Sequence, residues 1–389
     1  MSHYLKETER VLADLIAFPT LSRRSNRELI QYVKRYFEQL DIEVSLDPHP
    51  DGKRFNLFAT IGGTHKSGIL LSAHTDTVPA EREDWHTDPF KLKKSNGRLY
   101  GRGSVDMKGF LALILAFASS FKAVEKKLKT PIHYALTFDE EEGTLGAAQI
   151  KSFLKREGIK PQIAIVGEPT GMLPYNGHKG GLEMITKVTG SSGHASDPRK
   201  KANAIYFAAR LICFIEALSI ELTKSPVPNS MFQPPYTTLS IGTIKGGEAR
   251  NIIPNYCEFK WEIRPIAQDG RSLLKKIQNF TNKVLQPEMT ALDEKSRIDL
   301  IEVAHCPSLR VTKDSLAASL IQKLWTNDEP SVLSFGTDGA HYQDYGIDTI
   351  IFGPGDMNVM HKPNEYIDIS AIEDGISFMK NLLNYCQEN

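Results

Sequence analysis

Cysteine is scarce in this chain of 389 residues, and its four cysteines lie far apart in the sequence. They are Cys213, Cys257, Cys306 and Cys386. None of them forms a CxxC pair, which is the usual sign of a thiolate metal site or a redox motif. Because most of them have apolar neighbours, we expect reduced and largely buried thiols.

The sequence also lacks a net charge and any long apolar run. Its 47 basic side chains balance 47 acidic ones, so no excess of charge would attract nucleic acid or a membrane surface. The first residues carry no basic leader before an apolar stretch, and no later segment approaches the roughly 20 apolar residues of a membrane span. We therefore expect a soluble, cytoplasmic protein that binds neither nucleic acid nor membranes.

The chain does contain enough apolar sequence for two packed domains. Apolar residues make up 41% and charged residues 24% of it, which is typical of globular proteins. A chain of this length exceeds the size at which one hydrophobic core usually stops growing. We therefore expect two domains.

Short apolar strands alternate with helices in the first part of the chain. Two helices with apolar residues at helical spacing come first, at 4–18 and 26–40. We expect strands at 54–61, 68–73, 132–138 and 163–166, and helices at 108–124 and 146–157. This alternation predicts an α/β fold, with a mostly parallel sheet and helices on both of its faces.

The pattern changes between residues 178 and 306, where the order becomes β-α-β-β-α-β. The expected strands are 182–188, 238–245, 256–264 and 299–305, and the expected helices are 203–218 and 271–285. This order predicts a small antiparallel sheet with two helices. The earlier style then resumes, with helices at 314–325 and 370–386 and strands at 332–335 and 349–352. We therefore expect one domain formed by 1–177 and 307–389, with 178–306 inserted as an α+β domain.

Histidine and acidic side chains stand just after the strands of the first domain. His74 and Asp76 follow 68–73, Glu140 and Glu141 follow 132–138, Glu168 follows 163–166, and His361 follows 349–352 and its loop. Asp106 lies in a glycine-rich turn that leads into a helix. Because the carboxyl ends of parallel strands form the crevice where ligands bind, we expect these side chains to meet there.

Two imidazoles and three carboxylates of this set form a group of ligands that suits zinc, cobalt or manganese. The five residues are His74, Asp106, Glu141, Glu168 and His361. Five ligands can hold two ions if one ligand is shared, and a carboxylate can bridge ions about 3.5–4 Å apart because it has two oxygens. We therefore expect two divalent ions, with one of the three acids as the bridge.

Two further acids stand beside these ligands. Asp76 is expected to accept the second imidazole N–H of His74 and so to orient the ring. Glu140 is the candidate general base, which would take a proton from an attacking water and pass it to a leaving nitrogen. Each motif alone has an ordinary interpretation, such as a solvated helix start for the acidic run. A metal-dependent binding protein would need the ligands but not Glu140, so the presence of Glu140 favours catalysis.

Segments spread along the chain resemble the M20 family of metallopeptidases and deacylases, and within it the acetylornithine deacetylases. They are LLSAHTDTVP, GRLYGRGSVDMKG, TFDEEEGTLGA, IVGEPT, GSSGHAS, RNIIP and GPGDMNVMHKPNEY. The resemblance runs nearly from end to end. It implies a zinc-peptidase-like catalytic domain and an inserted lid domain that mediates dimerisation.

The resemblance also implies how the five ligands are shared between the ions. Asp106 would bridge both ions. His74 and Glu168 would complete one site, and Glu141 and His361 would complete the other.

Asp76 and Glu140 keep the same roles under this resemblance. The roles of Glu140 and Glu141 depend on how the acidic run Asp139–Glu142 is aligned with the family. A shift by one residue would give the two roles in the run to Glu141 and Glu142. The strand that ends in Phe138 favours the earlier pair, because it places that pair nearest the edge of the sheet.

Residues outside the metal centre also gain roles from the resemblance. His194 of GSSGHAS would reach a neighbouring active site in a homodimer and stabilise the oxyanion of the scissile carbonyl. Asn251 and Arg264 would hold the substrate, because an arginine can grip a carboxylate with two hydrogen bonds. Arg250 is a second candidate, and Gly336-Thr337 would form a loop that contacts a substrate carboxylate.

The implied reaction removes the acetyl group from N2-acetyl-L-ornithine and gives ornithine and acetate, a step of arginine biosynthesis. The ions would be Zn²⁺ or Co²⁺, and the substrate a small N-acyl amino acid. A succinyl-diaminopimelate desuccinylase is one alternative, although such enzymes tend to carry a TSDG-type loop where this chain has GTDGAHYQ. Another M20 deacylase or dipeptidase, and a non-catalytic metal-dependent binding protein, are further alternatives.

Overall fold

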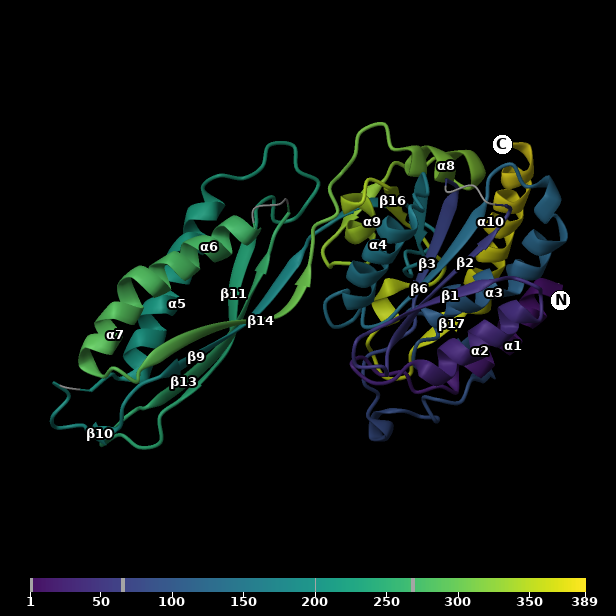
Figure 1. The fold of residues 1–389 in the computed structure, drawn as a ribbon. Coiled ribbons are helices and arrows are strands. Elements are labelled where there is room, and N and C mark those ends of the chain that lie inside the picture. The colour runs from purple at the N-terminus through teal and green to yellow at the C-terminus, as the bar shows by residue number, and fades with distance from the viewer. Residues whose placement is uncertain (1–2, 64–66, 200, 267–269) are drawn as a thin grey trace. The chain divides into compact units, whose positions relative to one another are not determined.

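The computed structural model describes residues 3–63, 67–199, 201–266 and 270–389. The chain forms two compact units (Figure 1). The first comprises Met1–Gly177, Val311–Ser331 and Thr337–Asn389, and the second comprises His178–Arg310 and Val332–Gly336. Residues 307–310 and Val332–Gly336 therefore group with the second unit, although the sequence pattern predicts them in the first domain.

The main sheet has eight strands in the order β1-β2-β6-β3-β7-β16-β8-β15, and all of them except β15 lie wholly or almost wholly in the first unit. The strands are β1 (Val44–Pro48), β2 (Phe55–Ile61), β3 (Ile69–His74), β6 (Ile132–Thr137), β7 (Ile163–Val166), β8 (Tyr175–His178), β15 (Ser331–Leu333) and β16 (Asp348–Ile351). The central strands β6, β3, β7 and β16 run parallel, whereas β2 and β8 flank them as antiparallel neighbours. The predicted α/β class with a mostly parallel sheet is confirmed.

Helices cover both faces of this sheet. They include α1 (His3–Ile16), α2 (Arg27–Glu38), α3 (Lys108–Ala123), α4 (Leu145–Glu157), α8 (Leu316–Leu324), α9 (Gly339–Asp344) and α10 (Ile369–Glu388). On one face α1 and α10 pack against α3, and α8 packs against α10. On the other face α4 packs against α9, where the hydroxyl of Tyr342 lies 2.8 Å from that of Ser72 in β3. Among the described residues, no helix is both long and apolar enough to cross a membrane.

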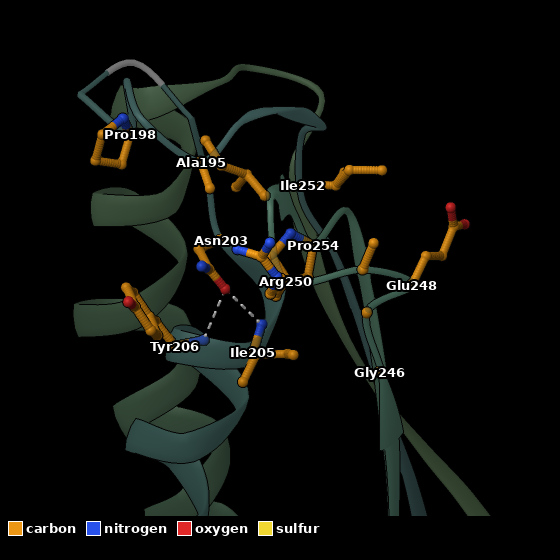
Figure 2. Close-up of a pocket in the computed structure, with 13 residues that line it drawn as sticks. Ala195, Pro198, Asn203, Ile205, Tyr206, Gly246, Glu248, Arg250, Ile252 and Pro254 are labelled. Atoms are coloured by element: carbon orange, nitrogen blue, oxygen red, sulfur yellow. Dashed lines mark hydrogen bonds between the residues drawn. The ribbon is translucent and has the colours of Figure 1, made fainter.

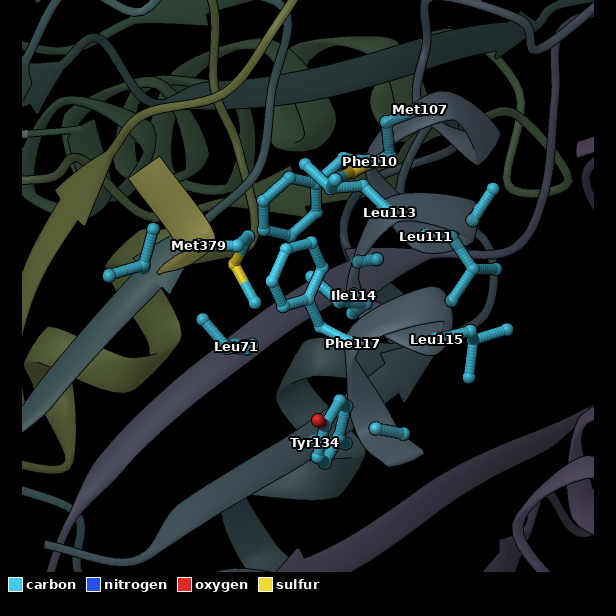
Figure 3. Packing of buried hydrophobic residues seen from close by; sticks show 14 of the residues in the cluster. Leu71, Met107, Phe110, Leu111, Leu113, Ile114, Leu115, Phe117, Tyr134 and Met379 are labelled. Atoms are coloured by element: carbon cyan, nitrogen blue, oxygen red, sulfur yellow. The ribbon is translucent and has the colours of Figure 1, made fainter. Parts of the chain in front are cut away.

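The core of the first unit centres on α3, whose side chains are buried on nearly every side. Figure 3 shows Phe110 and Phe117 of α3 with Leu71 of β3 and Met379 of α10, which belong to one hydrophobic cluster. A helix that is apolar all round is stable only when it is buried on all sides. The packing therefore fixes the start of α3, and with it the turn that carries Asp106.

The four parallel strands end at one edge of the sheet. His74 at the end of β3 pairs with Thr137 at the end of β6. Val166 at the end of β7 pairs with Ile351 at the end of β16. Residues that follow these strands therefore emerge at the same edge, as the parallel arrangement requires.

A small three-stranded sheet joins the part of the chain before Asp106 to the part after His361. Its order is β17-β5-β4, formed by β4 (Lys93–Ser95), β5 (Arg98–Tyr100) and β17 (Tyr366–Asp368). These strands are too short to give an alternating pattern, so they cannot be predicted from the sequence. Their pairing connects two segments that are distant in the chain.

The second unit contains a four-stranded antiparallel sheet with the order β11-β13-β9-β14. Its elements are β9 (Gly181–Thr189), α5 (Ala204–Thr223), β11 (Thr238–Gly246), β13 (Tyr256–Arg264), α6 (Gly270–Phe280) and β14 (Arg297–Cys306). The predicted order β-α-β-β-α-β is confirmed. The helical stretch passes the predicted end at 285, through a π-helical turn (Thr281–Leu285) into α7 (Gln286–Leu292). Pro287 lies in the first turn of α7, directly after the π-helical turn.

Leu111 in α3 offers a test of the assigned core. Leu111 is 0% exposed, whereas Leu173 in the same unit is 45% exposed. The substitution Leu111→Ala leaves a cavity and should lower the free energy of unfolding by about 2–5 kcal/mol. The matched control Leu173→Ala should change it by less than about 0.5 kcal/mol. Urea denaturation followed by tryptophan fluorescence measures both, and equally small effects would contradict the assignment.

Candidate metal centre

The imidazole of His74 lies between a carboxylate and a backbone carbonyl. His74 ends β3 and is 1% exposed. Its Nδ1 donates a hydrogen bond of 3.0 Å to the backbone carbonyl of Asp76, and its Nε2 lies 3.0 Å from Oδ1 of Asp106. Because the hydrogen bond of Nδ1 sets the tautomer, Nε2 is the nitrogen that can bind a metal ion.

The carboxylate of Asp106 also contacts a second imidazole. Oδ2 of Asp106 lies 3.0 Å from Nε2 of His361. The same Nε2 lies 2.9 Å from Oε2 of Glu141. Each oxygen of Asp106 thus faces a different imidazole, as is expected of a carboxylate that two metal ions share.

The five expected ligands form two overlapping groups. Ligand atoms of His74, Asp106 and Glu168 lie within 4.8 Å of one another. Those of Asp106, Glu141 and His361 form a second group by the same distance. Asp106 belongs to both groups, which is the division that the resemblance implied.

The acidic run after β6 presents Glu141, and not Glu142, to the imidazole of His361. The side chain of Glu141 is 8% exposed and contacts His361. Glu142 instead forms an ion pair of 2.8 Å with Arg23, and its side chain is 42% exposed. The geometry therefore favours the register in which Glu140 and Glu141 serve the centre.

The carboxylate of Asp76 binds the turn of the acidic run rather than the imidazole of His74. It accepts hydrogen bonds from the backbone N–H groups of Glu140 (3.0 Å) and Glu141 (3.3 Å) and from the hydroxyl of Ser22 (2.8 Å). Its Oδ1 is 3.6 Å from Nδ1 of His74, too far for a hydrogen bond. Asp76 therefore accepts the second imidazole N–H of His74 through its backbone carbonyl, while its carboxylate binds the N–H groups of the turn.

Burial and mutual repulsion make ionisation of the glutamates costly. Burial, and then the charge of Glu168, raise the pKa of Glu140 well above its usual value. Burial, and then the charge of Asp106, raise the pKa of Glu141 to about 7 and that of Glu168 well above its usual range. Burial also opposes the ionisation of Asp106, but hydrogen bonds with the two imidazoles outweigh it and lower the pKa. The centre thus concentrates negative charge, which bound cations would offset.

The donor atoms of this centre fit divalent metal ions. Glu168 is 4% exposed, and no hydrogen-bond donor among the described residues contacts its Oε1. A buried carboxylate oxygen without a partner is costly unless a cation binds it. Imidazole nitrogens and carboxylate oxygens are ligands that zinc and cobalt accept. The residues present therefore fit two divalent ions.

Two further buried acids, for which the sequence predicts no role, also lie in this region. Asp338 is 1% exposed, and its Oδ2 accepts a hydrogen bond of 2.6 Å from the hydroxyl of Thr137. Burial raises the pKa of Asp338 to about 7. Glu365 is 1% exposed and accepts hydrogen bonds from the backbone that leads to Asp106. In the sequence, the one sign that Glu365 is important is its position in the same motif as His361.

Three candidates for substrate binding and catalysis lie together in the second unit. β10 (Gly193–His194) pairs with β12 (Ile252–Ile253), which directly follows Asn251. His194 is exposed. Arg250 lines a neighbouring pocket of about 510 Å³ (Figure 2). The roles of His194, Asn251 and Arg250 toward a substrate stay predictions.

The remaining candidates are Arg264 and the loop Gly336-Thr337. Arg264 donates a hydrogen bond of 2.8 Å to the carboxylate of Glu262. Gly336 belongs to the second unit and Thr337 to the first. A Cβ atom at Gly336 would come within 2.4 Å of Sγ of Cys306, so a larger residue there would require the side chain of Cys306 to shift. The predicted contacts of these residues with a substrate also stay predictions.

Known proteins resemble this chain over most or all of its length. The family model of peptidase family M20/M25/M40 matches residues 70–385. The acetylornithine deacetylase of Yersinia pestis is 34% identical over 386 residues, which are 96% of this chain and 96% of the relative.

Solved structures of two M20 proteins share the fold. An M20 family metallo-carboxypeptidase of Sulfolobus solfataricus matches with a TM-score of 0.75 at 18% identity, covering 100% of both chains. A dinuclear metal-binding M20 peptidase of Bacillus subtilis matches with a TM-score of 0.67 at 16% identity, covering 99% of both chains. Both likenesses extend over the two units described here.

The substitutions Glu141→Gln and Glu142→Gln form a matched pair that tests the register of the acidic run. Glu141 contacts His361, whereas Glu142 pairs with Arg23. We expect zinc-loaded Glu141→Gln to lose one bound ion after dialysis, because only the group of His361 loses a ligand. Glu142→Gln should keep both ions. Metal analysis by mass spectrometry measures this, and loss of an ion from Glu142→Gln alone would reverse the assignment.

Proposed function

Because the chain belongs to peptidase family M20/M25/M40, we propose that it removes the acetyl group from N2-acetyl-L-ornithine and releases ornithine and acetate. The chain is a metal-dependent amidohydrolase, as its family and its curated relatives indicate. The observation that carries the choice of substrate is the likeness to acetylornithine deacetylases over nearly the whole chain. A role in arginine biosynthesis is part of the proposal.

Five residues of the first unit would hold two divalent ions. His74 and Glu168 would bind one ion, Glu141 and His361 the other, and Asp106 both. When bound, such ions polarise an amide carbonyl and lower the pKa of water. We propose Zn²⁺, and Co²⁺ accepts the same ligands. The two overlapping groups of ligand atoms and the unpartnered oxygen of Glu168 support this assignment.

Glu140 is the proposed general base. Its backbone N–H donates to the carboxylate of Asp76, which fixes the turn from which its side chain projects. As the carbonyl carbon forms a bond to the attacking water oxygen, the carboxylate of Glu140 takes a proton from that water. The amide C–N bond then breaks, and Glu140 delivers the proton to the leaving nitrogen. The products are acetate and the amino group of ornithine, which also takes up the second proton of the water.

Recognition of the substrate would involve the second unit and the loop Gly336-Thr337. Arg264 would bind a substrate carboxylate in exchange for Glu262, at small cost because that ion pair is partly exposed. Asn251 would hold the substrate. The partner's His194 would stabilise the oxyanion in a homodimer. The homodimer and the cytoplasmic location stay predictions of the sequence.

Replacement of the base tests whether Glu140 acts in catalysis. Glu140→Ala should lower kcat by about 10²–10⁴-fold, the usual contribution of a positioned acid–base group. Its metal content should stay unchanged, because Glu140 belongs to neither ligand group. The control Glu142→Ala, which removes only the partner of Arg23, should keep both activity and metal. Wild-type kcat in Glu140→Ala would remove this residue from the mechanism.

A panel of substrates tests the proposed reaction. The zinc- or cobalt-loaded protein should release acetate from N2-acetyl-L-ornithine with a kcat/KM at least about 10-fold above that for its competitors. The competitors are N-succinyl-diaminopimelate and a dipeptide, each followed by detection of the free amine. A higher kcat/KM for either competitor would replace acetylornithine as the substrate. No hydrolysis of any compound by metal-loaded protein would favour a binding protein instead.

A further inference from the structure

Glu365 is a buried carboxylate in the same loop as His361, yet it belongs to neither group of ligand atoms found among the described residues. Its Oε1 accepts hydrogen bonds from the backbone N–H groups of Val105 (2.9 Å) and Asp106 (3.2 Å). Its Oε2 accepts one from the backbone N–H of Gly103 (3.1 Å). Three backbone donors of one turn therefore converge on this carboxylate and fix the chain as it reaches Asp106.

The guanidinium of Arg102 completes these contacts. It lies 2.7 Å from Oε2 of Glu365, and the two side chains are 3% and 1% exposed. The same guanidinium donates to the backbone carbonyls of Lys362 (3.3 Å) and Pro79 (3.1 Å). Lys362 directly follows His361, and Pro79 lies in the loop after β3. One buried ion pair thus connects three segments that carry or adjoin metal ligands.

A carboxylate is required at position 365 because of the number and kind of its partners. Among the described residues, the carboxylate accepts hydrogen bonds from three backbone N–H groups and a guanidinium. A glutamine has one acceptor oxygen and an NH₂ group, so it would turn a donor toward some of these donors. The charge of the carboxylate also strengthens each of these hydrogen bonds.

We propose that Glu365 and Arg102 form a clamp that positions Asp106 and His361 for the two ions. Glu365 is then a positioning residue, because it acts through the backbone of Asp106 and through Arg102. The clamp is anchored outside the centre, since Tyr366 pairs with Tyr100 where β17 meets β5. This inference rests on the two-metal function proposed above.

The clamp positions more ligands in one group than in the other. The group of Asp106, Glu141 and His361 contains two clamped residues, Asp106 and His361. The group of His74, Asp106 and Glu168 contains only Asp106. Loss of the clamp should therefore weaken the ion on the side of His361 more than the ion on the side of His74.

Each ion can be measured alone after one group is disabled. Glu168→Gln keeps all three ligands of the group that contains His361. Glu141→Gln keeps all three ligands of the group that contains His74. In each background the Co²⁺ affinity by calorimetry and the Co²⁺ d–d absorption spectrum are recorded with and without Glu365→Gln. We expect an affinity loss of about 100-fold in the Glu168→Gln background and about 10-fold in the Glu141→Gln background, the range known for partners of metal ligands.

Asp348→Asn is the matched control. Its carboxylate also accepts backbone hydrogen bonds, from Leu316 and Ala317, but at the amino end of β16, away from the edge with the metal ligands. It should lower the melting temperature without changing either Co²⁺ affinity. Far-UV circular dichroism checks that each variant folds. If Glu365→Gln does not fold, Arg102→Lys takes its place and should show the same order of losses.

Unchanged Co²⁺ affinities and spectra in folded Glu365→Gln would overturn the clamp. Equal losses in both backgrounds, or losses of the same size in Asp348→Asn, would overturn it as well, because they indicate a general loss of stability. Failure of the parent protein to bind any Co²⁺ would instead contradict the proposed function on which the clamp rests. The parent measurement therefore separates the two failures.

Discussion

The concentration of carboxylates at one edge of the sheet is the constraint on which the rest of the first unit depends. Asp106, Glu141 and Glu168 lie in two overlapping groups around the imidazoles of His74 and His361. Burial and mutual repulsion raise the pKa of the two glutamates, so ionising them together is costly without a compensating positive charge. The fold must therefore hold each backbone segment in place, and divalent ions are the partners that such a donor set suits.

The fold provides two kinds of support for these segments. The first is the parallel sheet, which brings His74 and the segment after Thr137 to one edge through the pairing of β3 and β6. The second is a set of hydrogen bonds to backbone groups in the loops, where no strand pairing is available. Asp76 holds the acidic run in this way, and Glu365 holds the turn of Asp106. A catalytic centre needs such support because its geometry must be fixed before the substrate arrives.

The sequence places the candidate ligands at one edge of the sheet, but it gives little sign of the contacts that support them, for a physical reason. Apolar runs identify buried parallel strands, and the geometry of a parallel sheet then places residues such as His74 and Glu168 at one edge. Hydrogen bonds to backbone N–H groups produce no pattern in the sequence, because nearly every residue has the same N–H group. The acceptor atom of Asp76 and the contacts of Glu365 were therefore beyond the sequence. The boundary at Val332–Gly336 was missed because the segment is too short to show a pattern.

The number of protein hydrogen-bond donors around each carboxylate distinguishes acids that can bind an ion from acids that position other ligands. Oε1 of Glu168 has no donor among the described residues, so its lone pairs are free for a cation. The carboxylate of Glu365 accepts four hydrogen bonds from the protein, so few lone pairs remain for an ion. Asp338 stands between these cases, since Oδ2 accepts from Thr137 while Oδ1 has no donor among the described residues. Acids of one chemical type can thus bind ions or position ligands, because the backbone around them differs.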